Sequence, residues 1–220
     1  MGRCRRWRCG ETQLREIVMT DYSSLKSTIA SYLGRSDLTT QIPDFIQLAE
    51  ERLRRDLRTR QMLVVARANT TSGDETVGLP TDFLEMRDVH LRTNPVTSVT
   101  YLSPNAFYAT ARTTDSGQPV NYTILASEIQ FAPIPDSVYS IQMLYYGKPA
   151  YLSDTNIVNV FLTNYPDALL YAALGEAEPY LMNDARLQTW AALYDRSITA
   201  ISTADQNGEY GGQPMSMSVR

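Results

Sequence analysis

The stretch that decides the fold is IPDFIQLAEERLRRDLRTRQMLVVARANT, residues 42–70, in which a helical pattern gives way to a strand pattern. Its first half repeats apolar residues every three or four positions, at Ile42, Phe45, Ala49, Leu53 and Leu57. This spacing predicts a helix that is capped by Thr39 or Thr40 and ends near Arg60. From Gln61 onward, short runs rich in β-branched and aromatic residues predict strands. The chain therefore passes here from a helical unit into a β unit.

Helical patterns flank this stretch on both sides. Upstream, Asp21 is placed to cap a helix over 22–33 and Gly34 to end it. Downstream of the β region, Asn164 is predicted to cap one helix, and Asn183 or Asp184 to start another that runs to Gln206. The remaining residues, NGEYGGQPMSMSVR, show no helical periodicity, and their glycines and proline disfavour a regular helix.

These patterns predict an α+β protein in which the N- and C-terminal helices form a bundle around an inserted β domain. We assign residues 20–60 and 163–206 to the helical bundle and 61–162 to the inserted antiparallel β domain. Residues 207–220 are expected to form a flexible, extended C-terminal tail. A chain of 220 residues is long enough for this arrangement, because domains commonly contain about 100–150 residues.

The first eighteen residues differ from the rest of the chain. They contain both cysteines, Cys4 and Cys9, together with an arginine-rich run that has no apolar segment behind it. Two thiols are too few for a structural zinc site, and the arginines do not introduce a secretory signal. A capped helix begins directly after Met19. We therefore expect residues 1–18 to be a non-native or disordered leader and translation to start at Met19.

Few residues suited to catalysis or metal binding are present. His90 is the single histidine, it lies in a strand-like run, and no cysteine follows Cys9. The sequence lacks the side chains needed for histidine-dependent catalysis or for transition-metal binding, and it contains no phosphate-binding loop. The acid pairs Glu50–Glu51 and Glu176–Glu178 are predicted to lie on solvated helix faces. We expect a protein that is not an enzyme and binds no cofactor or metal.

The arginines of the central helix raise the question of nucleic-acid binding. They are Arg52, Arg54, Arg55, Arg58 and Arg60, in a chain whose net charge is −4 and which has eighteen arginines but two lysines. Glu51 with Arg55, and Glu50 with Arg54, are spaced as i,i+4 ion pairs. No aromatic residues accompany the run, whereas channels that bind single-stranded nucleic acid are lined with aromatic side chains that stack on the bases. The pattern favours a solvated or interfacial helix face over direct contact with nucleic acid.

The order of these features resembles the head-to-tail adaptor proteins of tailed bacteriophages. The resemblance covers about residues 20–206 and is closest to adaptors of short-tailed phages, including the tail tubular A type. It is carried by IPDFIQLAEERLRRDLRTRQM, VGLPTDFLEMRDVHL, MLYYGKPAYLS, NYPDALLYAALGEAEPYLMND and LQTWAALYDRSITAIS. It implies a structural virion protein that forms a ring of roughly twelve subunits below the portal, joins head to tail and continues the DNA channel.

The resemblance also implies the partners and the contact residues. The partners are the portal protein, a tail or nozzle protein, further copies of the chain, and genomic DNA that passes without sequence-specific binding; no membrane is involved. The location is the virion, after assembly in the host cytoplasm. The resemblance assigns 205–220 to portal binding, with the tail contacts Tyr210, Met215, Met217 and Arg220, and it places the five arginines at a subunit or portal interface.

Two other classes of function are weighed against this one. The first is a DNA-binding regulatory protein that uses the arginine-rich helix 49–61, for which affinity would fall steeply with salt. The second is a hydrolase of unknown type, for which the sequence offers no nucleophile and base. The adaptor accounts for nearly the whole length of the chain, whereas each alternative rests on one segment or on none.

Overall fold

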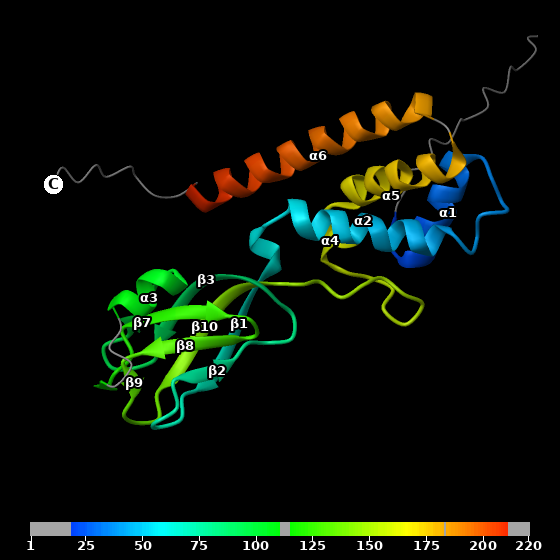
Figure 1. Cartoon of the computed structure of the whole chain (residues 1–220). Coiled ribbons are helices and arrows are strands. Elements are labelled where there is room, and N and C mark those ends of the chain that lie inside the picture. Colours follow the sequence, from blue (N-terminus) through cyan, green and yellow to red (C-terminus); the bar gives the residue numbers. More distant parts are fainter. Residues whose placement is uncertain (1–18, 111–114, 183, 211–220) are drawn as a thin grey trace, which may run out of the picture.

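The computed structural model describes residues 19–110, 115–182 and 184–210. A helical bundle lies beside a β domain, and the β domain is inserted between the second and third bundle helices of the chain (Figure 1). The predicted α+β class, a bundle of N- and C-terminal helices with an inserted β domain, is therefore confirmed. The bundle helices are α1 (Tyr22–Leu33), α2 (Ile42–Asp56), α4 (Val160–Asn164), α5 (Pro166–Leu181) and α6 (Asp184–Tyr210).

The first helix has the predicted boundaries because both ends carry local stop signals. The Asp21 carboxylate accepts a hydrogen bond of 2.7 Å from the Ser24 backbone N–H, and the Ser24 hydroxyl oxygen accepts one from the Asp21 backbone N–H, which completes a capping box. At the other end, Gly34 adopts a left-handed conformation with φ of 65°. Both predictions for α1 are confirmed.

The ends of the later helices differ from the predictions. No side chain caps α2, whose N-cap residue is Gln41 rather than Thr39 or Thr40. The helix also stops at Asp56, and a short 3-10 turn, η1 (Arg60–Met62), leads into the first strand. Asn164 ends α4 instead of capping α5, and Asn159 is the residue that caps α4. At α4 the cap is fixed by tertiary contacts, because the Asn159 amide also donates to Glu50 and to the Ala150 carbonyl.

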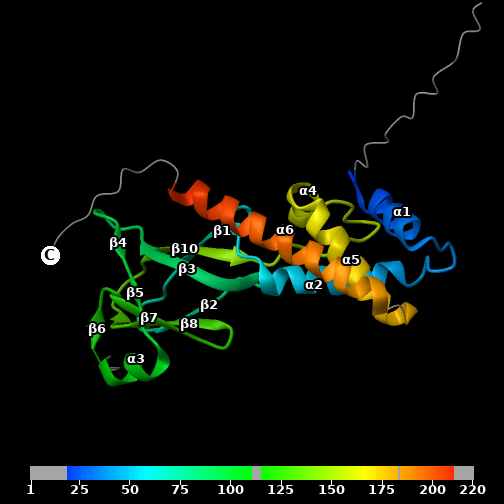
Figure 2. The same cartoon turned by 90° about the horizontal axis from the view of Figure 1, so that it is seen from above.

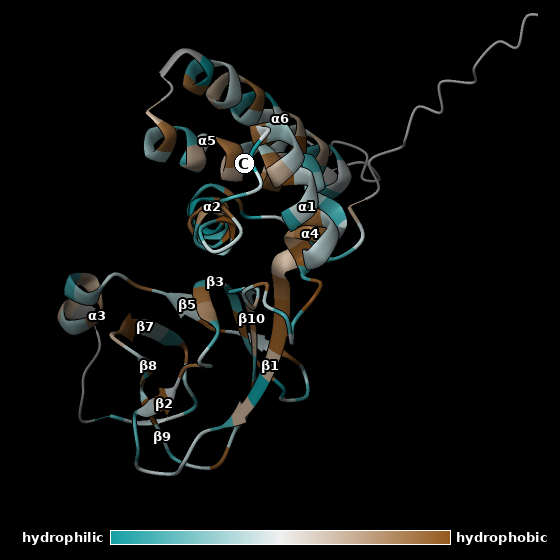
Figure 3. Cartoon of the chain, turned by 90° about the vertical axis from the view of Figure 1, so that its right-hand side faces the viewer, coloured by the Kyte–Doolittle hydropathy of each residue, from teal (hydrophilic) through white to brown (hydrophobic). Residues whose placement is uncertain are grey.

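The bundle has its own apolar core, in which α5 lies against α1, α2 and α6. Alanines at 168, 172, 173 and 177 are fully buried on α5, and their small side chains let the neighbouring helices approach closely. From α2, the predicted apolar stripe of Ile42, Phe45, Ala49 and Leu53 is buried in the same core. Figure 3 shows that hydrophobic residues occur in both the bundle and the β domain.

The β domain consists of two four-stranded sheets and one short pair. The first sheet has the order β1 (Leu63–Asn69), β10 (Ser140–Gly147), β3 (Phe83–Leu91), β4 (Thr97–Ser98). The second has the order β2 (Thr76–Gly78), β8 (Glu128–Ala132), β7 (Asn121–Leu125), β5 (Thr100–Tyr101). The short pair is β6 (Ser116–Gly117) with β9 (Ile134–Pro135), and a helix, α3 (Pro104–Thr110), precedes it in the chain.

Pairing in the two sheets is largely antiparallel, as the sequence predicted. The long ladders β1 with β10, β10 with β3, and β7 with β8 are all antiparallel. Two short pairings, β5 with β7 and β6 with β9, are parallel, which the alternation of residues did not reveal. A second apolar core fills the domain and includes Val89, Leu91, Ile129, Phe131, Ile141 and Met143.

The last helix is longer than predicted. We expected it to end at Gln206, but α6 runs to Tyr210 and extends past α2 toward the β domain (Figures 1 and 2). Arg60 donates to Asp205 at 3.1 Å and Arg87 of β3 pairs with Glu209, so the far end of α6 is held by two ion pairs. A Cβ atom at position 208 would overlap the Arg60 guanidinium, so any larger residue there would require this side chain to shift. The predicted flexible tail beyond Tyr210 lies outside the described residues.

A buried carboxyl joins α2 to the segment that returns from the β domain. Glu50 is 1% exposed, and its Oε1 atom accepts hydrogen bonds from the Leu152 backbone N–H at 3.1 Å and from Asn159 Nδ2 at 2.5 Å. Burial disfavours the charged form and raises the pKa of Glu50 from its ordinary 4.5 to about 7, against the opposite effect of these two hydrogen bonds. The neutral acid is therefore the preferred form in the folded protein below neutral pH.

This carboxyl should make folding stability depend on pH. Its contribution is fully present below pH 4.5 and is lost as the pH rises through about 7, because the unfolded chain ionises first. The free energy of unfolding should then fall by roughly 1–3 kcal/mol between pH 5 and pH 8 through this group. Glu50→Gln keeps a side-chain oxygen that can accept these hydrogen bonds but cannot ionise. It should therefore remove that part of the decline in stability. Urea unfolding at both pH values measures it, and an equal decline in the two proteins would contradict the assignment.

Candidate assembly interface

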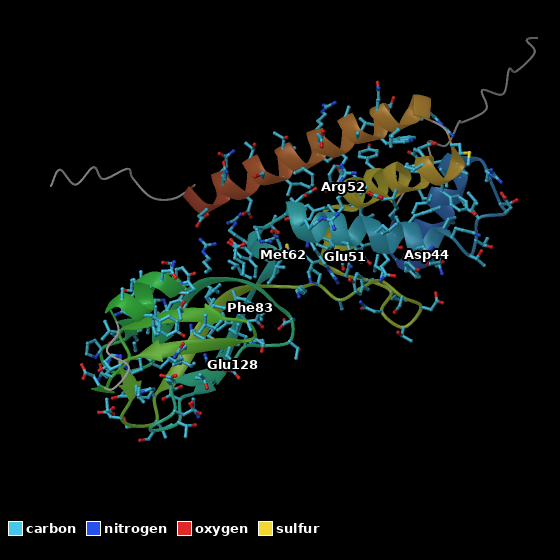
Figure 4. All side chains as sticks on the ribbon, viewed as in Figure 1. Asp44, Glu51, Arg52, Met62, Phe83 and Glu128 are labelled. Atoms are coloured by element: carbon cyan, nitrogen blue, oxygen red, sulfur yellow. The ribbon has the colours of Figure 1, made fainter. Side chains whose placement is uncertain are left out.

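The five predicted arginines lie along the C-terminal half of α2 and the short segment that leads from it to the β domain. Figure 4 shows Arg52 near the end of α2, Met62 between that helix and the β domain, and Phe83 at the near edge of the domain. Met62 is buried, which places the connection against the bundle core. The arginines do not share one site, and their individual contacts show what each one does.

Arg52 and Arg54 are engaged within the protomer. Arg52 lies 3.6 Å from Glu176 of α5, and its guanidinium lies 4.2 Å from the centre of the Tyr194 ring of α6. Arg54 is 8% exposed, donates to Glu51 at 3.0 Å and to the carbonyl of Pro149, and lies 3.6 Å above the Tyr151 ring. Arg54 therefore does not lie on a solvated face, contrary to the prediction for the run.

Arg58 and Arg60 connect elements across the junction. Arg58 donates to the backbone carbonyls of Arg54 and Leu57 at 2.7 Å each and to Glu85 of β3 at 2.9 Å. It thus satisfies carbonyls at the end of α2, where a cation also complements the helix dipole, and joins that end to the first sheet. Arg60 reaches Asp205 of α6.

Arg55 differs from the other four arginines. Its side chain is exposed, and it forms no ion pair with another residue in the part of the chain that the structure describes. The predicted i,i+4 pair of Glu51 with Arg55 is replaced by the i,i+3 pair of Glu51 with Arg54. Asp44, Leu48 and Arg55 share one face of α2, since they are four and seven positions apart. Leu48 is 52% exposed, so this face combines an apolar side chain with a cation.

The predicted tail contacts are placed only in part. Tyr210 is the last residue of α6. Met215, Met217 and Arg220 lie outside the described residues, so their role in binding stays a prediction.

Two buried acids were not foreseen. Glu50 and Glu178 are each 1% exposed, whereas the sequence suggested solvated faces for the pairs that contain them. Glu178 accepts a hydrogen bond of 2.9 Å from Trp190 Nε1 and lies 3.3 Å from Arg186, so it connects α5 to α6. The sequence did carry a signal for this burial: Glu50 follows Ala49, and Glu178 follows Ala177, in the apolar stripe of each helix. The acidic residue type alone gave no such indication.

The described residues show no cluster of potential metal ligands. His90 lies in β3 and contacts Asp88 at 2.9 Å. Over 19–110, 115–182 and 184–210, no group of three or more potential metal ligands is found. Nor does any helix in these ranges have the length and apolar character needed to cross a membrane.

Comparison with known families gives the class of the protein. The sequence matches the family described as SU10 adaptor protein over residues 20–218. Because this match spans nearly the whole chain, the protein belongs to that family, a group of phage head-to-tail adaptors with a structural role in the virion. No curated protein shows significant similarity to the chain.

The two neighbouring arginines 54 and 55 should differ sharply when substituted. Arg54→Met should lower the free energy of unfolding by about 2–4 kcal/mol, because it leaves the Pro149 carbonyl and a half-buried Glu51 without their partner. Arg55→Met, on the exposed side, should change it by less than about 0.5 kcal/mol. Urea denaturation of both variants measures this difference. Equal losses would show that Arg54 is not held as described.

Proposed function

We propose that the protein forms a ring below the portal, joins the phage head to the tail and continues the channel through which DNA leaves the head. The observation that carries this proposal is the family match over residues 20–218, which covers both the bundle and the β domain. The partners are the portal protein, a tail or nozzle protein and neighbouring copies of the chain. A ring of roughly twelve subunits follows the symmetry expected of the portal. Assembly would take place in the host cytoplasm.

The contacts within the protomer narrow down which arginine faces a partner. Arg52, Arg54, Arg58 and Arg60 already hold acids or carbonyls of the same chain. Arg55 and Leu48 remain exposed, two helical turns apart, on the face of α2 that also carries Asp44, here called the outer face of α2. An apolar side chain beside a cation suits a contact in which the leucine is buried and the arginine meets an acid on the partner. We assign this outer face of α2 to the contact with the next subunit or the portal.

The alternative, a DNA-binding regulator, has less support from the geometry. It requires several arginines on one accessible helix face, and four of the five have partners within the protomer. A net charge of −4 also disfavours strong binding of phosphates. Both features suit a channel through which DNA slides without being held.

The outer face of α2 provides a direct test. Leu48→Ser and Arg55→Glu should each weaken assembly on the portal by about tenfold, because both residues are exposed in the free subunit and buried in the proposed contact. Arg196→Glu is a matched control, since Arg196 is an exposed arginine of α6 on another side of the bundle. Co-sedimentation with purified portal over a range of concentrations measures the effect. If all three variants assemble equally well, the outer face of α2 is not the contact.

The second test concerns the tail. Met215, Met217 and Arg220 are proposed to bind the portal, and a weak contact repeated around a ring gives firm attachment. A chain ending at Tyr210 keeps Asp205 and Glu209, so it should unfold at nearly the same temperature as the full chain. It should nevertheless fail to co-sediment with the portal. Met215→Ser with Met217→Ser should do the same, whereas Ser216→Ala with Ser218→Ala should not. Full binding by the truncated chain would contradict the assignment of the tail.

A further inference from the structure

A groove opens between the two sheets of the β domain, and neither the bundle nor α3 fills it. It has a volume of about 510 Å³ and runs along β3. Phe83, Met86 and Arg87 of β3 form one wall, and Tyr101, Tyr122 and Ile124 of the second sheet form the other. Most of these side chains are apolar or aromatic, and Tyr101 is 52% exposed. An exposed apolar groove of this kind is a candidate binding site.

The groove is also bordered by open strand edges. β4 pairs only with His90 and Leu91, so within the described residues 83–88 of β3 have a neighbouring strand on the β10 side alone. Across the groove, β5 pairs only with Asn121 and Tyr122, so in the described part of the chain 123–125 of β7 have no neighbouring strand on that side. Unpaired backbone groups beside an apolar groove are the features that bind an added strand.

The C-terminal end of α6 is held at this groove. Glu209 pairs with Arg87, which is itself part of the groove wall, and Tyr210 is the next residue. The ten residues that follow are GGQPMSMSVR. In extended form they reach up to roughly 33 Å, which exceeds the length of the open β3 edge.

The sequence of this segment has the pattern of a strand. Met215, Met217 and Val219 alternate with Ser216 and Ser218, which gives one apolar and one polar face in an extended chain. A proline directly before them is compatible with the first position of an edge strand. The two glycines after the helix allow the chain to turn.

We infer that residues 215–219 bind as an added strand along β3 in the free subunit, with Met215, Met217 and Val219 in the groove. The open edge extends from Arg87 toward Phe83, because β4 occupies the other end. A segment that enters beside Arg87 therefore runs antiparallel to β3. Methionine side chains suit a groove that contains Tyr101 and Tyr122, because their sulfur atoms pack well against aromatic rings.

The chain's own segment is favoured over other occupants by its tether. The ion pair of Glu209 with Arg87 keeps the segment next to the groove, so its effective concentration there is in the millimolar range. A second copy of the chain or another protein would have to reach that concentration in solution to compete.

This inference adds a regulatory role to the tail, and that role rests on the proposed function. The residues that fill the groove are the ones proposed to bind the portal, so the two sites compete for one segment. The portal would release the segment from β3 and leave the groove open for a strand from a tail protein. Docking itself needs no portal, so it is tested on the free protein.

Disulfide trapping tests the docking. In a chain with Cys4→Ser and Cys9→Ser, the pair Met86→Cys and Met217→Cys should cross-link within the monomer under mild oxidation. The control pair, Met86→Cys and Ser216→Cys, differs by one position and places the thiol on the opposite face, so it should cross-link at least about tenfold more slowly. Mass spectrometry after proteolysis identifies the linked peptides. Covalent dimers in place of monomers would overturn the assignment of the chain's own segment, and equal rates for the two pairs would overturn the strand register.

Hydrogen exchange provides a second, label-free test. In the full chain, outward amides of residues 84–88 should exchange about tenfold more slowly than in a chain ending at Tyr210. Amides of β1, whose free edge lies on the far side of the first sheet, serve as the internal control and should not change. Identical exchange at 84–88 in the two proteins would overturn the inference. That result would leave the proposed portal contact of the tail untouched. Conversely, a truncated chain that still binds the portal would refute the portal contact and leave the docking on β3 untouched.

Discussion

Both connections between the bundle and the β domain are fastened to one helix, α2. The outgoing connection, 57–62, is held by Arg58, which bonds the carbonyls of Arg54 and Leu57 and reaches Glu85 of β3. The returning connection, 148–159, is held by Glu50 and Arg54 through the Leu152 N–H, the Asn159 amide and the Pro149 carbonyl. Buried polar groups need such partners, so the side chains of Glu50, Arg54 and Arg58 fix how the two parts of the chain meet.

This constraint explains why an arginine-rich helix occurs in an acidic protein. Arginine can bond several acceptors at once and pack over a ring, so Arg54 holds a carbonyl, a carboxylate and the Tyr151 ring together. The end of α6 is attached in the same way, through Arg60 and Arg87. Most of these arginines therefore stabilise contacts within the protomer. Leu48 and Arg55, on the outer face of α2, remain exposed and available to a partner.

The sequence predicted the parts of the fold that depend on local signals. The cap at Asp21, the end at Gly34 and the apolar stripe of α2 are set by residues within a few positions of each other, and all are present. It did not predict that Glu50 and Arg54 are buried, because their partners at 149–159 are about a hundred positions away. Nor did it predict that α6 extends to Tyr210. The partners of Asp205 and Glu209 lie on distant elements, and their ion pairs outweigh the low helix propensity of Gly208. For the interface, composition suggested arginines in general, and only the contacts single out Arg55.

Electron cryo-microscopy of the protein assembled on its portal tests the central claim most directly. If Arg54 and Arg58 brace the subunit, then in the assembled particle Arg54 still contacts Pro149 and Arg58 still contacts Glu85, while Leu48 and Arg55 are covered by a neighbouring chain. The account is contradicted if Arg54 and Arg58 have left these partners and instead contact DNA phosphates or acids of the portal, with Leu48 and Arg55 still exposed to solvent.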